Sequence, residues 1–368
     1  MPQIDSITML GLKLVWAIAA FVRQSPFRSI YQTSGLHRLL TACHQQLYRR
    51  VLQACEQHGP VRQDIPLPSF DWQTQSSEEF FRTYVQTPHP VVLKGFAQDS
   101  SVLERLTFEA LLDQYGDETV LLTTKMKDGY LGKLRKVSNP NVYLHNSEML
   151  LAKYPELLAD LPLQALERFC QKKPVYSQLF IGRQGTGSPF HCAAVWNFFF
   201  QMEGQKRWYF VDPRDSVFLH PLHVMGRQAG IALCKYPHDY DQETFPAFAY
   251  CPVYTTVLEP GDVLLSPAWW WHGIENLTPT TVGVATRWCK GGTVGQDWMM
   301  TEEDYEINRF FSWLFQMGFD SVPFLHSILK TPSPNYDEHS TLRERKSRYV
   351  SDQERMSRGE VRGIRFRF

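Results

Sequence analysis

Residues 188–213 read SPFHCAAVWNFFFQMEGQKRWYFVDP, and this stretch decides the fold. It is made of short apolar and aromatic runs separated by glycine, proline or polar residues, a pattern that continues over residues 176–290. Short strands at such spacing are typical of an antiparallel sandwich or barrel. The sequence therefore predicts a β-rich domain in the middle of the chain.

The composition sets limits on the class of protein. The chain has 368 residues, enough for one large domain, and its 38 basic and 38 acidic residues balance. A balanced charge gives no support to a nucleic-acid partner or an acidic substrate. The seven cysteines are scattered and form no Cys-x-x-Cys pair, which favours a reducing compartment. We therefore expect a cytoplasmic protein whose thiols are buried as small hydrophobic groups.

The N-terminal part is predicted to be helical, because apolar residues recur at helical spacing over residues 5–57. Within it, residues 9–22 (MLGLKLVWAIAAFV) are apolar except for Lys13. This run is shorter than the roughly 20 residues of a membrane span, and it lacks the basic start and clean cleavage site of a secretory signal. We expect a helix packed on the main domain; a helix on a membrane surface and a membrane anchor are the alternatives.

Composition divides the chain into three parts. Residues 1–65 are an N-terminal helical segment and a Pro-rich linker, residues 66–295 the barrel domain with its helical lead-in, and residues 296–368 C-terminal helices and an Arg-rich tail. Residues 302–318 are apolar almost all round, which predicts a buried helix. The tail is expected to be solvated, and binding to an acidic partner or to nucleic acid is the alternative.

Two histidines in this β region have the setting of metal ligands. Residues i and i+2 of a strand point to the same face, so a His-x-Asp or His-x-Glu strand brings an imidazole and a carboxylate to one ion. A histidine from a distant strand then completes a facial triad for non-haem Fe(II). Here His191 and His272 are the candidates, but the carboxylate position holds Ala193, and Cys192 points to the other face. A structural role for both histidines is the alternative.

The phrases around these histidines resemble those of the JmjC-type, cupin-like oxygenases, especially the branch that includes the asparaginyl hydroxylase of the hypoxia response. The matching phrases are SPFH (188–191), WNFFFQMEGQKRWYFVDP (196–213), His220-Pro221, LEPGDVLLSPAWWWHGIENL (258–277) and VGVATRW (282–288). The resemblance covers residues 176–290 and extends weakly to residues 90–95. It implies a double-stranded β-helix (cupin or jelly roll) with flanking N- and C-terminal helices, a β-rich α+β fold that uses Fe(II) and 2-oxoglutarate.

The resemblance also implies roles for individual residues. Lys206 matches the lysine that pairs with the distal carboxylate of 2-oxoglutarate, and Tyr143 matches a tyrosine whose hydroxyl touches the same carboxylate. Ser188 and Asn197 stand where polar residues lie beside the cosubstrate. The apolar neighbours of Lys206 are consistent with this role, because they place the lysine in the interior, where its charge needs an anionic partner. A surface lysine is the alternative.

Near the end of the matched region, Arg287 follows Thr286. A guanidinium there could bind a carboxylate through two hydrogen bonds or form a surface ion pair. In the family that the chain resembles, the C-terminal helices often form a dimer interface, so a homodimer through them is expected as an alternative to packing on the barrel.

Ala193 is the departure from the family pattern, and it has three interpretations. Water fills the gap and oxygenation persists; chloride fills it, as in the related halogenases that have Ala or Gly there; or the site is inactive and the domain is a binding or scaffold protein. Glu203 or Asp262 could also supply a carboxylate from elsewhere. We expect an Fe(II)/2-oxoglutarate-dependent oxygenase that acts on a protein side chain or a small molecule.

Overall fold

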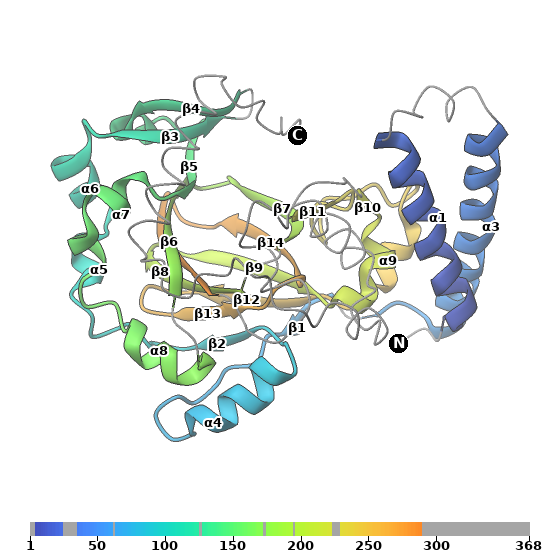
Figure 1. Cartoon of the computed structure of the whole chain (residues 1–368), viewed down its shortest axis with the longest axis horizontal. Coiled ribbons are helices and arrows are strands. Elements are labelled where there is room, and N and C mark those ends of the chain that lie inside the picture. The colour runs from blue at the N-terminus through green and yellow to red at the C-terminus, as the bar shows by residue number, and fades with distance from the viewer. Residues whose placement is uncertain are drawn as a thin grey trace, which may run out of the picture.

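The computed structural model describes residues 4–24, 35–61, 63–124, 127–171, 174–193, 196–222 and 229–288. Two β-sheets form the centre of the molecule, short helices flank one end of them, and a pair of long helices stands at the other end (Figure 1). The prediction of a β-rich α+β fold of the double-stranded β-helix type is confirmed by this arrangement. The residues expected to form the C-terminal helices, the dimer interface and the tail lie outside the described residues.

The first sheet has seven strands. Its pairs are antiparallel except the one between the first two strands. In spatial order the strands are β1 (Ile65–Pro66), β12 (Tyr254–Leu258), β9 (Lys206–Val211), β14 (Trp271–Asn276), β7 (Gly187–Ala193), β11 (Ala229–Ala232) and β10 (Pro221–Leu222).

The second sheet has eight strands, and its pairs are all antiparallel. In spatial order they are β2 (Val91–Leu93), β13 (Val263–Ser266), β8 (Trp196–Glu203), β15 (Thr280–Trp288), β6 (Pro174–Arg183), β5 (Val142–Ser147), β3 (Thr119–Thr124) and β4 (Lys127–Lys133).

Strand β8 explains why the sequence reads as continuous apolar runs rather than as an alternating pattern. Phe198 and Phe200 pack in the large core between this sheet and the helices, whereas Phe199 belongs to a smaller cluster with Trp208 and Phe210 of β9. A strand covered on both faces can be apolar at every position. The smaller cluster therefore marks the space between the two sheets, and side chains on the same faces as its members point into that interior.

The helices follow the predicted segments with one difference. The apolar pattern of residues 102–116 predicts one helix, but α5 (Val102–Arg105) ends at Arg105. The Thr107 side chain accepts a hydrogen bond from the Ala110 amide to begin α6 (Phe108–Tyr115). A threonine that caps a helix favours a new start over continuation. Residues 147–172 are predicted to be helical with breaks near Pro155 and Pro162, and both breaks are confirmed. Two long helices, α1 (Ser6–Gln24) and α3 (Gly35–His58), come first in the chain. The helices that follow them are α4 (Ser77–Phe80), η1 (Phe81–Gln86), α5 (Val102–Arg105), α6 (Phe108–Tyr115), η2 (Leu134–Ser138), α7 (Met149–Lys153), η3 (Pro155–Leu158), α8 (Leu163–Cys170), η4 (Pro213–Asp215), α9 (Ser216–Leu219) and η5 (Pro246–Tyr250).

The N-terminal helices α1 (Ser6–Gln24) and α3 (Gly35–His58) pack side by side at one end of the molecule (Figure 1). The predicted helical character of this region is confirmed for the part that the structure describes. The pair is attached to the barrel through Tyr48, whose hydroxyl lies 2.7 Å from Nε2 of His220. No helix within the described residues is long and apolar enough to cross a membrane.

Candidate functional site

His191 and His272 lie directly opposite each other on the neighbouring strands β7 and β14, and their ring centroids are 4.3 Å apart. Nδ1 of His191 is 2.9 Å from the carbonyl oxygen of Pro189, and Nδ1 of His272 is 2.8 Å from that of Trp270. Because a carbonyl oxygen only accepts, each Nδ1 carries a proton and donates it. Each Nε2 is then left with a lone pair, the arrangement that a metal-binding imidazole needs.

Burial keeps this pair of histidines neutral. Loss of solvent lowers the pKa of both rings, and the proximity of His191 lowers that of His272 further. The positive charge of Arg287 acts in the same direction on both. Arg287 also donates from Nε to Oε1 of Gln178, 2.9 Å away, on β6. Arg287 therefore acts electrostatically on the histidine pair.

The strand position that faces the same side as His191 holds Ala193, whose side chain is no metal ligand. Ala193 is two residues along β7, and its carbonyl oxygen accepts a hydrogen bond of 2.8 Å from the Trp269 amide. Within the described residues, no set of three His, Cys, Asp or Glu side chains could hold a metal ion. The described chain thus offers two imidazoles to an ion. Cys192 packs in the outer core, as its position in the strand predicts.

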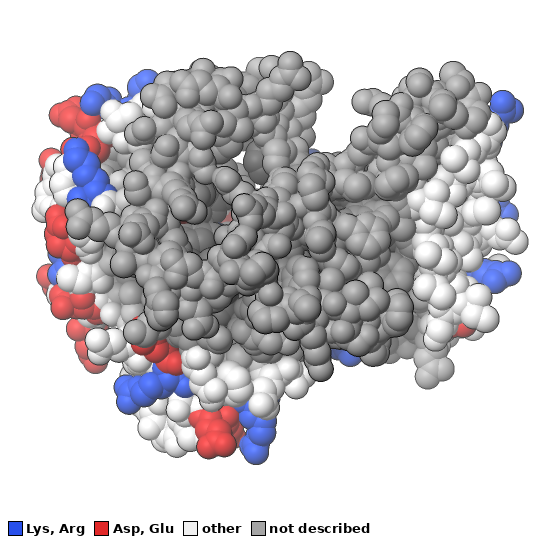
Figure 2. All heavy atoms as spheres, viewed as in Figure 1, with Lys and Arg blue, Asp and Glu red and all other residues white. Residues whose placement is uncertain are grey.

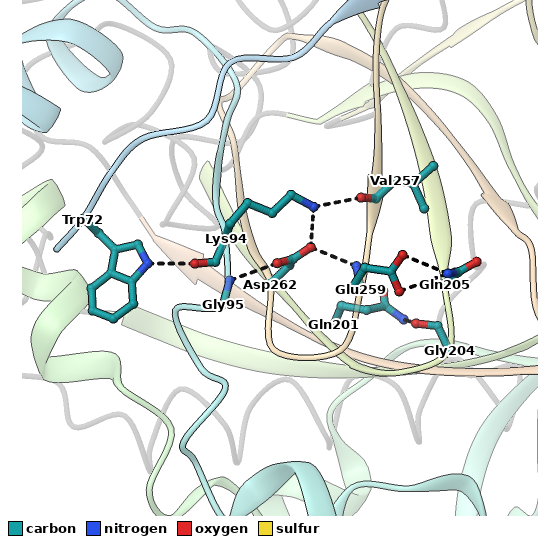
Figure 3. Close-up of polar contacts among 9 residues, drawn as sticks. All are labelled: Trp72, Lys94, Gly95, Gln201, Gly204, Gln205, Val257, Glu259 and Asp262. Carbon is teal, nitrogen blue, oxygen red and sulfur yellow. Dashed lines mark hydrogen bonds and ion pairs between the residues drawn. The ribbon is translucent and has the colours of Figure 1, made fainter.

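The two carboxylates considered as substitutes are engaged elsewhere, so that expectation is wrong. Glu203 accepts hydrogen bonds from the Phe108 amide and the Thr280 hydroxyl. Asp262 accepts from Lys94 Nζ at 2.7 Å and from the Gly95 amide at 3.0 Å (Figure 3).

The surroundings of Asp262 show what that carboxylate does. It also accepts from the Glu259 amide at 2.9 Å, so it ties the turn between β12 and β13 to the end of β2 (Figure 3). The Lys94 ammonium continues to the carbonyl oxygen of Val257, 3.1 Å away. A buried carboxylate with this many donors holds the backbone of the turn in place and has no oxygen to spare for an ion.

Lys206 lies inside the barrel, with 1% of its surface exposed. Its ammonium donates to Oδ1 of Asn276 at 2.5 Å and to the Thr281 hydroxyl at 2.9 Å. Both acceptors are neutral, and no Asp or Glu within the described chain forms an ion pair with Lys206. Burial without a counter-charge lowers the pKa of Lys206 to about 7. This arrangement leaves a cation ready for an anion that the described residues do not supply.

The acceptors around Lys206 are themselves oriented. Asn276 donates from Nδ2 to the Thr186 hydroxyl at 2.8 Å, which fixes its Oδ1 toward Lys206. The Thr281 hydroxyl also lies 3.0 Å from that oxygen. We call Lys206, Asn276 and Thr281 the lysine cradle.

Tyr143 lies beside the lysine cradle. A Cβ atom built on Gly182 would lie 3.0 Å from Cε2 of Tyr143 and 2.2 Å from Nδ2 of Asn276. The two side chains therefore converge on Gly182, where only a glycine leaves room for both. Burial raises the pKa of Tyr143, so its hydroxyl is a neutral hydrogen-bond donor.

Asn197 and Ser188 face the same interior from other strands. Asn197 shares the inner face of β8 with Phe199, and its buried Oδ1 has no hydrogen-bond partner. Ser188 of β7 lies opposite Ile274 of β14, which packs against the interior cluster. No donor among the described residues reaches Oδ1 of Asn197, so a bound ligand or a water molecule would have to satisfy it.

Sequence reasoning missed several residues of this interior. His145 stacks on Tyr143 with ring centroids 5.4 Å apart, and burial together with the nearby His191 lowers its pKa to about 4. Trp208 stacks on His272 at 5.9 Å. The position of His145 two residues after Tyr143 was a usable signal, since the two share one strand face. Asn276 and Thr281 gave none, because strand register alone brings them to Lys206.

The two facing sheets, the cross-strand histidine pair and the buried lysine agree with a cupin-like domain in this part of the chain. Residues 128–290 match the family model described as "Cupin-like domain", which confirms the predicted resemblance.

Three individual proteins are similar to parts of this chain. The chain is 36% identical over 109 residues to HSPB1-associated protein 1 homolog of Danio rerio, and the match covers 29% of this chain and 24% of the relative. It is 25% identical over 246 residues to Jumonji C domain-containing protein 5 of Drosophila melanogaster, covering 60% of this chain and 59% of the relative. It is 24% identical over 244 residues to tRNA wybutosine-synthesizing protein 5 of Gallus gallus, covering 57% and 73%. The match to the HSPB1-associated relative thus spans about a quarter of that protein.

Proposed function

We propose that this protein is an Fe(II)- and 2-oxoglutarate-dependent oxygenase that oxidises a C–H bond of a protein side chain or a small molecule. The observation that carries the proposal is the lysine cradle. A fully buried ammonium with two neutral acceptors is unfavourable unless an anion joins it, and the distal carboxylate of 2-oxoglutarate is such an anion.

The spacing of the lysine cradle and the histidine pair supports the same ligand. Lys206 is paired with Asn276 across β9 and β14, and His272 lies four residues before Asn276 on β14. Four residues of strand separate Cα atoms by about 13 Å. Two inward side chains and a five-carbon dicarboxylate between them fill such a distance.

The described residues supply two of the three protein ligands that an iron ion of this kind has, together with the lysine that would bind 2-oxoglutarate. His191 and His272 would hold the metal through Nε2, since both Nδ1 atoms are engaged. When bound, Fe(II) with 2-oxoglutarate supplies the oxidising chemistry. The protein's own part is to hold the distal carboxylate on Lys206, to donate from Tyr143, and to keep water out with the aromatic cluster around Trp208.

Ala193 distinguishes this site from one with a full facial triad. A methyl group there contributes neither a bond nor a negative charge, so water or chloride would complete the coordination.

Turnover of the cosubstrate tests the proposal. The full chain is purified without oxygen, loaded with Fe(II), and assayed for succinate formed from 2-oxoglutarate with and without chloride. Succinate formed without chloride supports the oxygenase. Succinate that requires chloride assigns the domain to halogenation instead, and absence of both iron binding and 2-oxoglutarate binding assigns it to binding or scaffolding; either result would overturn the proposal.

A further inference from the structure

Helix α1 has an exposed apolar stripe, which we define as Ile7, Leu10, Leu14 and Ile18. Their exposed fractions are 77%, 49%, 48% and 44%. The spacing of three and four residues places them on one face of the helix. Leu12, on the opposite side, is fully buried against the rest of the molecule. The helix is thus apolar on the side that packs and also on the side that faces solvent.

The N-terminal segment that contains the stripe has a positive net charge in the sequence. Residues 1–58 hold six lysines and arginines, at positions 13, 23, 28, 38, 49 and 50, against two carboxylates, Asp5 and Glu56, which gives a net charge of +4. The whole chain is neutral, so the remainder is acidic. In Figure 2 the part of the α1–α3 end that is not grey shows mostly uncharged surface with scattered basic areas and a small acidic one, whereas the opposite end has many residues of both signs.

Asp5, the carboxylate nearest the stripe, is already engaged. Its oxygens accept hydrogen bonds from the amide and the hydroxyl of Thr8, 2.9 and 2.7 Å away, at the start of α1. These bonds, with the charge of Arg50, lower the pKa of Asp5. Asp5 therefore stays ionised at the start of α1, where the charge of Arg50 partly offsets it.

We propose that the α1–α3 pair docks the protein on an anionic lipid surface, with the stripe inserted at the headgroup boundary and the arginines on anionic headgroups. Such a surface offers both an apolar layer and negative charge. A second copy of this chain would offer the apolar contact but would bring two regions of charge +4 together.

The attachment of the pair to the barrel gives this docking a consequence for the site. The bond between Tyr48 and His220 joins α3 to the segment that leads into β10. Strand β10 pairs with β11, and β11 pairs with β7, which carries His191. A docked helix pair would thus hold the barrel at a fixed orientation to the lipid surface.

Vesicle co-sedimentation of the full chain tests the proposal. We expect binding to vesicles of equal parts phosphatidylserine and phosphatidylcholine, and much weaker binding to phosphatidylcholine alone. The double variant Leu10→Glu/Leu14→Glu should lose about a hundredfold in affinity, roughly tenfold for each leucine. The matched control is Leu233→Glu, a leucine of the barrel domain with a similar exposed fraction of 47%, and it should bind as the wild type does.

A charge variant separates the two sources of affinity. Arg38→Gln/Arg49→Gln should weaken binding to the anionic vesicles by roughly fivefold per arginine and leave binding to phosphatidylcholine unchanged. Circular dichroism and the melting temperature show that each variant folds. A wild type that binds neither vesicle would overturn the proposal. So would a wild-type dimer that the double leucine variant converts to monomer, because the stripe would then be a protein interface. The assay needs neither iron nor 2-oxoglutarate, so its failure is distinct from failure of the proposed oxygenase.

Discussion

The two ends of the barrel interior differ in how completely the protein equips them. At one end, the Lys206 ammonium donates to two neutral acceptors, and no carboxylate among the described residues pairs with it. At the other end, His191 and His272 each have a free Nε2 lone pair, because each Nδ1 donates to a carbonyl oxygen. Ala193 has no side chain that could be a third ligand, and no other described residue completes the set. We propose from this comparison that recognition of a dicarboxylate and retention of a metal are separable properties of this fold. Each can be altered by a substitution that leaves the other end untouched.

The largest effect is expected at the lysine end. Lys206→Met should weaken binding of 2-oxoglutarate by about a hundredfold, because loss of one partner of a buried charge pair costs roughly 2–5 kcal/mol. Isothermal calorimetry measures the change. The matched control is Lys235→Met, which removes a lysine whose side chain is 60% exposed and should leave the affinity unchanged. Equal losses in both variants would contradict the account.

A carboxylate placed inside the cradle should compete with the ligand. Asn276→Asp puts a negative charge on the group that accepts from Lys206 at 2.5 Å, so the variant supplies the missing counter-charge itself. We expect 2-oxoglutarate binding to fall by about tenfold or more. The control is Asn276→Gln, which keeps the neutral amide. Unchanged affinity in the Asp variant would argue that the ligand does not meet Lys206.

The metal end should respond to a restored carboxylate. Ala193→Asp is expected to raise Fe(II) affinity by roughly tenfold, because it adds a negative ligand on the face of His191. Ala193→Asn has the same shape without the charge and should gain much less. Metal titration measures both variants, and 2-oxoglutarate affinity without metal should stay constant. An Asp variant no tighter than the Asn variant would show that position 193 does not face the ion.

The smallest effect is expected from the tyrosine beside the cradle. Tyr143→Phe removes one neutral hydroxyl, and a neutral hydrogen bond contributes roughly 0.5–1.5 kcal/mol, so 2-oxoglutarate binding should weaken by about three- to tenfold. Tyr130→Phe on β4 is the control, since its ring contacts the ammonium of Lys136 away from the cradle. A loss as large as that of Lys206→Met would mean that Tyr143 supports the fold.

Much of the fold followed from local pattern, and much of the candidate site did not. The aromatic runs predicted the strands, and the two prolines predicted the helix breaks, because both signals act within a few residues. The cradle depends instead on β14 lying beside β9 and on β15 lying in the facing sheet, neither of which local sequence records. Thr107 divided a predicted helix through a single side-chain hydrogen bond.

The stripe on α1 is a second feature that the sequence pattern could not predict. Residues 9–22 are apolar nearly throughout, so their pattern could not distinguish a packed face from an exposed one. Only the position of α3, with Leu47 close to Gly11, decides which side is covered. Tertiary contacts rather than periodicity therefore separated the buried leucine at position 12 from its exposed neighbours.

The protonation of Lys206 on ligand binding tests the central claim most directly. With a pKa of about 7, Lys206 is mostly neutral at pH 8, and a bound carboxylate raises that pKa. Affinity for 2-oxoglutarate should therefore fall as the pH rises above 7. Calorimetry at pH 8, in buffers of different ionisation enthalpy, should show uptake of close to one proton per 2-oxoglutarate bound. Lys206→Met should show none. Binding by the wild type without proton uptake would contradict the claim that Lys206 receives the carboxylate.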